Sequence, residues 1–181
     1  TEARTQLQTA LKSAEASRKL YDTLQGRINY ALKVIEWWDG EEHKATTLAM
    51  LKKRVEDSQI KVTDYSLTTT QLNNATKILN AQINAVDKKI YCSPSACGTE
   101  EQLNQSSSQW TYERSMQSKH WIIFWEAGYG TTPPSSVESI LSTADQVFEF
   151  YANELKFITI NQGKSKTDTY KMIIRLRYTD E

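Results

Sequence analysis

Two cysteines and two histidines are the residues best suited to redox or metal chemistry in this chain. Cys92 and Cys97 enclose a turn-rich Ser-Pro-Ser-Ala segment, and Gly98 follows directly. Thiols at this spacing could close a small disulfide loop, which would predict an oxidising, extracytoplasmic compartment. Free thiols are the alternative. A zinc site is disfavoured because the other soft ligands, His43 and His120, are single residues far apart in the sequence.

No sequence motif for catalysis or phosphate binding occurs in the chain: HExxH, the P-loop, GxSxG and GxGxxG are all missing. Gly128-Tyr-Gly130 is a GxG fragment, but two threonines and two prolines follow it instead of the helix start that would bind phosphate. His120 precedes an apolar segment without an identifiable nucleophile, which favours a structural role. Glutamates 113, 126, 138 and 149 form no sequential acid–base pair. We therefore expect no catalytic residue, metal ligand or cofactor in this chain.

Five of the six aromatic residues within positions 110–129 form a candidate binding surface. Exposed aromatic rings bind glycans or proteins, whereas the same composition is also typical of a strand in a core. We keep both interpretations for these residues: Trp110, Tyr112, Trp121, Trp125 and Tyr129.

The elements that would position these residues differ between the two halves of the chain. Residues 1–91 contain 14 basic and 11 acidic residues, and residues 92–181 contain 8 and 11, so charges of +3 and −3 cancel to zero. Six of the 18 aromatic residues precede the division and 12 follow it. A neutral total disfavours a nucleic-acid binder that relies on a basic surface, and no apolar run is long enough to span a membrane.

The first half predicts a bundle of three antiparallel helices. Apolar residues recur at steps of three and four, and short polar connections separate the segments. One continuous helix should run past Gly26 to Trp37-Trp38-Asp39-Gly40, and Thr68–Thr70 could cap the third helix. The expected buried positions are Leu7, Leu11, Ala14, Tyr21, Leu24, Ile28, Ala31 and Ile35, then Leu48, Leu51, Val55 and Val62, then Leu72, Ala75, Leu79, Ile83, Val86 and Ile90.

The second half predicts a partial strand–helix–strand unit. Lys119–Glu126 is rich in β-branched and aromatic residues and is apolar on both faces in its middle, which favours a buried strand. Tyr170–Tyr178 alternates between apolar and polar side chains. Between them, Ser135 and Glu138 match a capping box for a helix of about twenty residues. Its apolar face comprises Val137, Leu141, Ala144, Phe148, Tyr151 and Leu155. We also expect short strands at 110–114 and 157–160. A unit of this kind leaves part of its sheet uncovered, so we expect the natural protein to continue beyond Glu181.

The expected fold class is therefore mainly α with a smaller α/β part. We expect a three-helix bundle over residues 1–91, a linker with the cysteine loop over 92–117, and the partial α/β segment over 118–181.

The segment from Arg114 to Tyr178 resembles the start of a zincin-type metallopeptidase-like domain found in secreted gut-bacterial proteins. The resemblance is carried by residues 120–130 (HWIIFWEAGYG), 150–157 (FYANELKF) and 163–174 (GKSKTDTYKMII). Residues 1–91 resemble the variable helical modules that precede such domains. In that family the HExxH helix, with its two zinc-binding histidines, follows the segment present here. No metal ligand or catalytic residue of the family therefore transfers to this chain, although the full-length protein could bind zinc.

Together these features predict a non-catalytic N-terminal region of a secreted or cell-surface bacterial protein. It would act as a scaffold or spacer for a C-terminal metallopeptidase domain. The alternative is a stand-alone extracellular module that binds glycan or protein through exposed aromatic residues. Neither reading involves nucleic acid or a membrane span.

Overall fold

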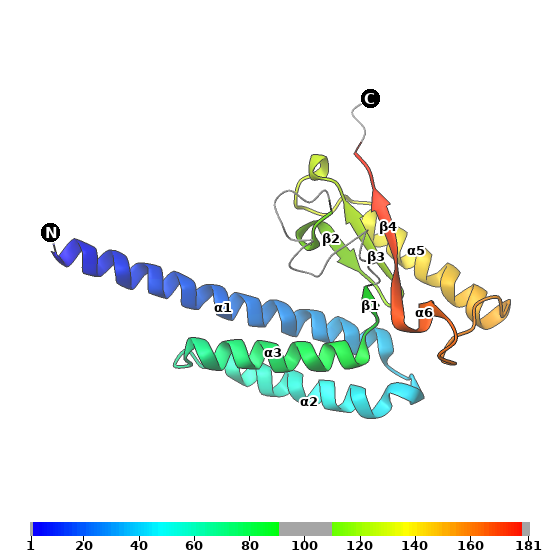
Figure 1. Ribbon diagram of the computed structural model, residues 1–181, viewed down its shortest axis with the longest axis horizontal. Helices are drawn as coiled ribbons and strands as arrows, with labels where there is room; N and C mark the ends of the chain where they lie inside the picture. Colours follow the sequence, from blue (N-terminus) through cyan, green and yellow to red (C-terminus); the bar gives the residue numbers. More distant parts are fainter. Residues whose placement is uncertain (1, 91–109, 179–181) are drawn as a thin grey trace. The chain divides into compact units, whose positions relative to one another are not determined.

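The computed structural model describes residues 2–90 and 110–178, and the chain divides into two compact units, Thr1–Asp87 and Lys88–Glu181. The fold is mainly helical with a small four-stranded sheet, which confirms the predicted class (Figure 1). The division after Asp87 precedes the predicted one after residue 91. The reason is that Lys89–Ile90 form strand β1 of the sheet, so Ile90 does not belong to the third helix.

The first unit is an up-down-up bundle of three helices, α1 (Glu2–Trp38), α2 (Ala45–Val62) and α3 (Thr69–Val86), as Figure 1 shows. α1 passes through Gly26 without a break, and Gly40, with φ of 80°, ends the run by turning the chain where a side chain would be strained. Its core contains most of the predicted residues: Tyr21, Leu24, Ile28, Ala31, Leu48, Leu51, Val55, Leu72, Ala75, Leu79, Ile83 and Val86. Val34 is also buried, whereas the predicted Ile35 and Val62 are only partly buried.

One part of the predicted α1 seam is not buried. α1 has 37 residues, whereas α2 and α3 have 18 each, so the first part of α1 runs past the ends of its neighbours (Figure 1). Leu7 is 72% exposed and Leu11 is 58% exposed, and Ala14 is also exposed. The periodicity of the sequence identified the correct helix face, but it could not show how far the partner helices extend.

The second unit is built on the sheet β1-β4-β3-β2. β3 (Trp121–Trp125) and β4 (Tyr170–Leu176) are parallel and are joined through helix α5 (Val137–Glu149), as the strand–helix–strand prediction required. β2 (Ser115–Gln117) pairs antiparallel with β3, and β1 pairs parallel with β4. Both faces of β3 are buried. One face packs with Val137 and Leu141 of α5, and the other lies with Ile90, Trp110 and Tyr112.

Three local predictions in this unit are wrong. Residues 112–114 form a 3₁₀ turn before β2, so no strand covers 110–114, and residues 157–160 form no strand either. The capping box of Ser135 and Glu138 is missing, because α5 starts after Ser136, whose side chain makes no capping hydrogen bond. Instead, the Val137 N–H donates to the carbonyl of Pro134, so this backbone turn starts the helix.

The C-terminal end of α5 also departs from the predicted face. Val137, Leu141 and Phe148 are buried as expected, but the helix widens into a π-helix over Phe150–Glu154. A π-turn contains more residues than an α-turn, so the buried position after Phe148 passes to Ala152. Tyr151 and Leu155 are exposed as a result. A short helix, α6 (Lys166–Thr169), leads from the following loop into β4.

Candidate functional site

A buried polar cluster surrounds His120 at the start of β3. The His120 side chain is 5% exposed and stacks on the ring of Phe148, with ring centres 4.0 Å apart. Its Nδ1 lies 2.7 Å from Nζ of Lys88, and its Nε2 lies 2.8 Å from Oε1 of Glu149. An ammonium group only donates, so Nδ1 accepts from Lys88 and the ring proton resides on Nε2, which donates to Glu149.

The surroundings of His120 keep its ring neutral. Burial and the neighbouring positive charge of Lys88 lower the pKa of His120 to about 4, although Glu149 favours the protonated ring. Protonation at Nδ1 would place two positive groups against each other. At neutral pH His120 is therefore an uncharged bridge between a cation and a carboxylate, with both ring nitrogens engaged. This agrees with the structural role predicted for it.

Glu149, the last residue of α5, is held on both oxygens. Oε1 also lies 3.1 Å from Nζ of Lys119, and Oε2 accepts from the Asn153 side chain at 2.7 Å. Burial alone would raise the pKa of Glu149, but hydrogen bonds from His120 and Lys119 outweigh it, so this pKa is lowered. The carboxylate consequently stays charged and ties the end of α5 to the start of β3.

Asp145 and Lys171 extend the cluster along α5 and β4. Oδ1 of Asp145 accepts from the His120 backbone N–H at 3.1 Å, and burial raises the pKa of Asp145. Lys171 is 2% exposed, and its Nζ donates to the carbonyl of Ser118 at 2.7 Å. No sequence pattern indicated that Lys88 is buried, because Lys89, which is exposed, follows it directly. The alternation of residues 170–178 placed Lys171 on the polar face of its strand, but the structure buries it.

The five predicted binding aromatics do not form an exposed platform. Trp125 is 1% exposed in the core, where its indole N–H donates to the Gly130 carbonyl at 3.0 Å, so the proposal that it is exposed is wrong. Trp121 packs against the α5-side cluster, and Trp110 and Tyr112 pack on the opposite face of the sheet. These residues are core-forming because β3 is buried on both faces. Tyr129 alone among the five is exposed.

Tyr129 instead pairs with a residue that the sequence analysis did not select. Its ring and that of Tyr178 are 5.1 Å apart at 87°, and both rings are partly exposed. The Tyr129 hydroxyl donates to the carbonyl of Arg177, and the Tyr178 N–H donates to the Glu126 carboxylate at 2.8 Å. A Cβ on Gly128 would lie 2.4 Å from the Tyr178 ring, so glycine is required for this packing. The pair follows the carboxyl ends of β3 and β4, where open parallel sheets place ligands.

A second exposed apolar surface lies where α5 ends. We define the α5-end patch as Val147, Phe150, Tyr151, Leu155 and Phe157, all of them exposed, with Phe157 at 74%. The Tyr151 ring contacts two other aromatic rings. Its centre lies 6.2 Å from that of Phe150 and 6.0 Å from that of Phe157. The Phe157 N–H donates to the Tyr151 carbonyl, while Lys156 takes a left-handed conformation with φ of 57°. This hydrogen bond and the left-handed turn end the helix that begins with α5 and leave the Phe157 side chain exposed to solvent.

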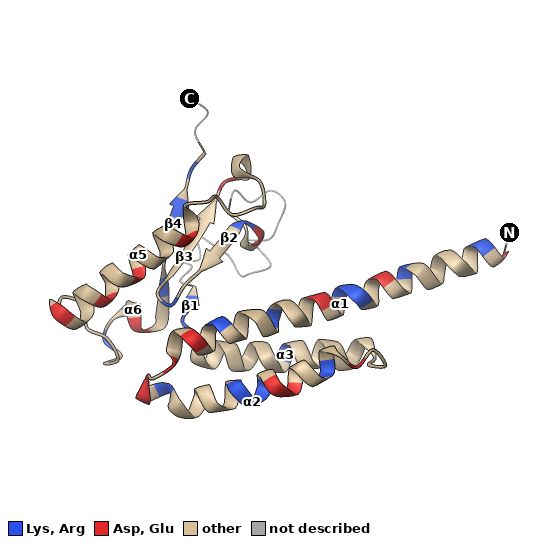
Figure 2. Cartoon of the chain, turned by 180° about the vertical axis from the view of Figure 1, so that it is seen from behind, with Lys and Arg blue, Asp and Glu red and all other residues tan. Residues whose placement is uncertain are grey.

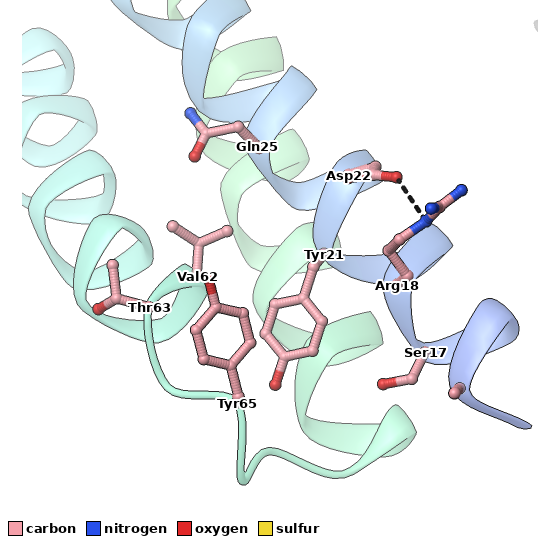
Figure 3. Close-up of a pocket in the computed structure, with 9 residues that line it drawn as sticks. Ser17, Arg18, Tyr21, Asp22, Gln25, Val62, Thr63 and Tyr65 are labelled. Carbon is pink, nitrogen blue, oxygen red and sulfur yellow. Dashed lines mark ion pairs between the residues drawn. The ribbon is translucent and has the colours of Figure 1, made fainter.

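An open groove in the helical unit lies between α1 and the end of α2 (Figure 3). Its volume is about 570 Å³, and Tyr21 and Tyr65 lie side by side in it with ring centres 5.4 Å apart. The Tyr21 hydroxyl donates to the Asp64 carbonyl at 2.6 Å. Arg18 and Asp22 form an exposed ion pair at the rim, 3.9 Å apart.

Within residues 2–90 and 110–178, no group of three or more His, Cys, Asp or Glu side chains could hold a metal ion. None of the helices in the same part of the chain is long and apolar enough to cross a membrane. The predicted disulfide between Cys92 and Cys97 lies outside the described residues and stays a prediction.

The chain belongs to a family of unknown function, DUF6055, whose model matches residues 82–181. The match spans 100 of the 181 residues and includes the whole second unit. No curated protein and no solved structure matches the chain.

Proposed function

We propose that this DUF6055 chain is a non-catalytic scaffold that precedes a zinc metallopeptidase-like domain in a secreted or cell-surface bacterial protein. The helical bundle would serve as the spacer, and the β3–α5–β4 unit as the front of the catalytic fold. The resemblance of residues 114–178 to zincin-type domains supports this assignment. The observation that carries it is the α5-end patch, because exposed apolar surfaces of this kind are typical of interaction sites.

The patch suits a scaffold because it lies on the crossover helix itself. The same helix end holds Glu149, whose contacts with His120 and Lys119 tie it to the sheet. A domain that packed on Phe150 and Phe157 would therefore rest on an element whose position is already determined by buried polar contacts.

The coding sequence beyond Glu181 provides the test. We expect an HExxH motif within about one further domain length, roughly 100 residues. In the longer protein, amide exchange at residues 147–157 should slow relative to the 181-residue chain. Phe150→Ser with Phe157→Ser should reverse this protection. Tyr65→Ser, which changes a more exposed aromatic residue of the bundle, should not. A stop codon directly after Glu181, or unchanged exchange in the longer protein, contradicts the proposal.

A second candidate function is extracellular glycan binding, which the exposed Tyr129–Tyr178 pair favours. Two tyrosine rings beside the Glu126 carboxylate offer stacking surfaces together with a hydrogen-bond acceptor. Titration with soluble glycans should shift the NMR signals of these rings, and Tyr129→Ala should remove the response. Tyr65→Ala is the matched control, since that ring is exposed in the other unit. A response that survives Tyr129→Ala would exclude this site.

A further inference from the structure

The N-terminal arm of α1, residues Glu2–Ala16, is a helix without neighbours in the bundle. Every residue of the arm is exposed, whereas from Tyr21 onward one face of α1 is buried against α2 and α3. At 1.5 Å per residue the arm is about 22 Å long. An isolated helix of about this length is only marginally stable in water, so packing on the arm would stabilise it.

One face of the arm carries a stripe of apolar residues in which small alanine and large leucine side chains alternate. Its members recur at steps of three and four and continue through Ser17 into the buried seam of Tyr21 and Leu24. The stripe is therefore an extension of an interface that the bundle already uses, at a level where α2 and α3 have ended. It consists of Ala3, Leu7, Ala10, Leu11 and Ala14.

The C-terminal end of the stripe, at Ala14, borders the groove shown in Figure 3. Ala14 and Ser17 line one wall, and Val62 and Tyr65 at the end of α2 line the other. Tyr65 is 84% exposed although its ring lies against Tyr21. An added helix running along the arm would end in this groove and cover that ring.

We propose that two copies of the chain pair through their N-terminal arms as an antiparallel helical dimer. With the two-fold axis between Ala10 and Leu11, Leu7 of one copy faces Ala14 of the other, and Leu11 faces Ala10. Large residues then pack against small ones, as close antiparallel helices require. A parallel pairing would place leucine against leucine and alanine against alanine, which leaves gaps between the alanines.

Charge also fits this antiparallel arrangement. The arm contains Glu2, Arg4, Lys12 and Glu15, so it is neutral and two arms do not repel each other (Figure 2). The same register brings Ala3 of one copy beside Arg18 of the other, which lines the groove. The antiparallel orientation additionally opposes the two helix dipoles. A second copy therefore supplies an occupant that matches the stripe in length, size pattern and charge.

Light scattering coupled to size-exclusion chromatography tests the proposal on the full chain. We expect the mass to approach twice 20.8 kDa as the protein concentration rises. Leu7→Glu with Leu11→Glu should leave a monomer at every concentration. Thr9→Glu with Ala16→Glu adds the same charge on the opposite face of the arm and should leave the dimer intact. Circular dichroism and melting of both variants establish that the bundle still folds.

The register is tested separately by charge exchange. Ala3→Lys places a cation beside Arg18 of the other copy and should weaken dimerisation about two- to five-fold, as expected for one exposed charge pair, and adding Arg18→Glu should restore it. A monomer at all concentrations overturns the proposal. So does a dimer that persists in the Leu7→Glu, Leu11→Glu variant, because its interface must then lie elsewhere. Dimer loss in the Leu variant without rescue by charge exchange overturns the antiparallel register.

Discussion

At the scale of residues, the central feature of the second unit is a buried histidine used for structure. His120 bridges Lys88 and Glu149, and its backbone N–H donates to Asp145. Three elements, the start of β1, the start of β3 and the end of α5, are thereby connected through one imidazole ring. Buried charged groups are tolerated where they are paired and hydrogen-bonded, and this cluster meets that condition.

The depressed pKa of His120 predicts a specific dependence of stability on pH. The folded pKa is about 4 and the ordinary value is 6.5, so between these values the unfolded chain binds more protons than the folded one. The free energy of unfolding should therefore fall as pH falls from 6.5 to 4, by up to roughly 3 kcal/mol, and His120 should add nothing below that window. Urea unfolding followed by amide exchange in residues 115–125 measures this.

His120→Gln is the control for that experiment. Glutamine retains a hydrogen-bonding group but does not titrate, so the loss of stability between pH 6.5 and 4 should largely disappear. An unchanged slope in the variant would mean that another group is responsible.

Removal of the Glu149 carboxylate should destabilise the second unit. Glu149→Ala leaves His120 and Lys119 without this acceptor, and we expect a loss of about 1–3 kcal/mol in the free energy of unfolding. Glu149→Gln retains an oxygen for the His120 Nε2–H and should cost less. Denaturant titration of both variants at pH 7 tests the order, and equal losses would show that charge, and not the hydrogen bond, is decisive.

At the scale of elements, sequence patterns predicted the helices, the main strands and their apolar faces. They did not predict how far neighbouring elements extend to cover those faces. The spacing of Leu24, Ile28, Leu79 and Ile83 identified the helices and their buried faces. It could not show that Leu7 lies beyond the ends of α2 and α3. By contrast, the apolar composition of β3 on both faces favoured a buried strand, and the burial of Trp125 agrees with the core interpretation that the sequence left open.

The candidate site was the least predictable part for the same reason. Lys88, His120, Glu149 and Lys171 come from separate elements, and only the parallel crossover brings them together. Similarly, the π-helix that exposes Tyr151 has no local sequence signature, because it reflects how α5 ends over the sheet.

The capping box at the start of α3 gives a prediction at this scale. The Thr68 side chain accepts from the Gln71 N–H, and the Gln71 side chain accepts from the Thr68 N–H at 2.8 Å. Thr68→Ala should therefore lower the free energy of unfolding of the bundle by about 1 kcal/mol. Thr70→Ala, two positions into the same exposed turn, should change it by much less. Thermal melts by circular dichroism compare them, and equal effects would contradict a specific capping role.

At the scale of the whole molecule, the two units have separate hydrophobic cores. The bundle core contains only residues from the first unit, and the two clusters around β3 contain only residues from the second. The family match follows the same division, since it includes the second unit and only the last turn of α3. The family model thus covers the α/β unit and leaves almost all of the helical bundle outside its match.

Separate cores predict that a core mutation acts within its own unit. Leu79→Ala removes a fully buried side chain from the bundle and should cost about 2–5 kcal/mol there. Ile122→Val removes one methyl group from β3 and should cost about 0.5–1.5 kcal/mol in the second unit. Hydrogen exchange resolved by peptide should show faster opening of residues 20–86 in the first variant and of residues 115–125 in the second. If Leu79→Ala accelerated exchange equally in β3 and β4, the two units would unfold as one cooperative body, and their separate cores would not make them independent.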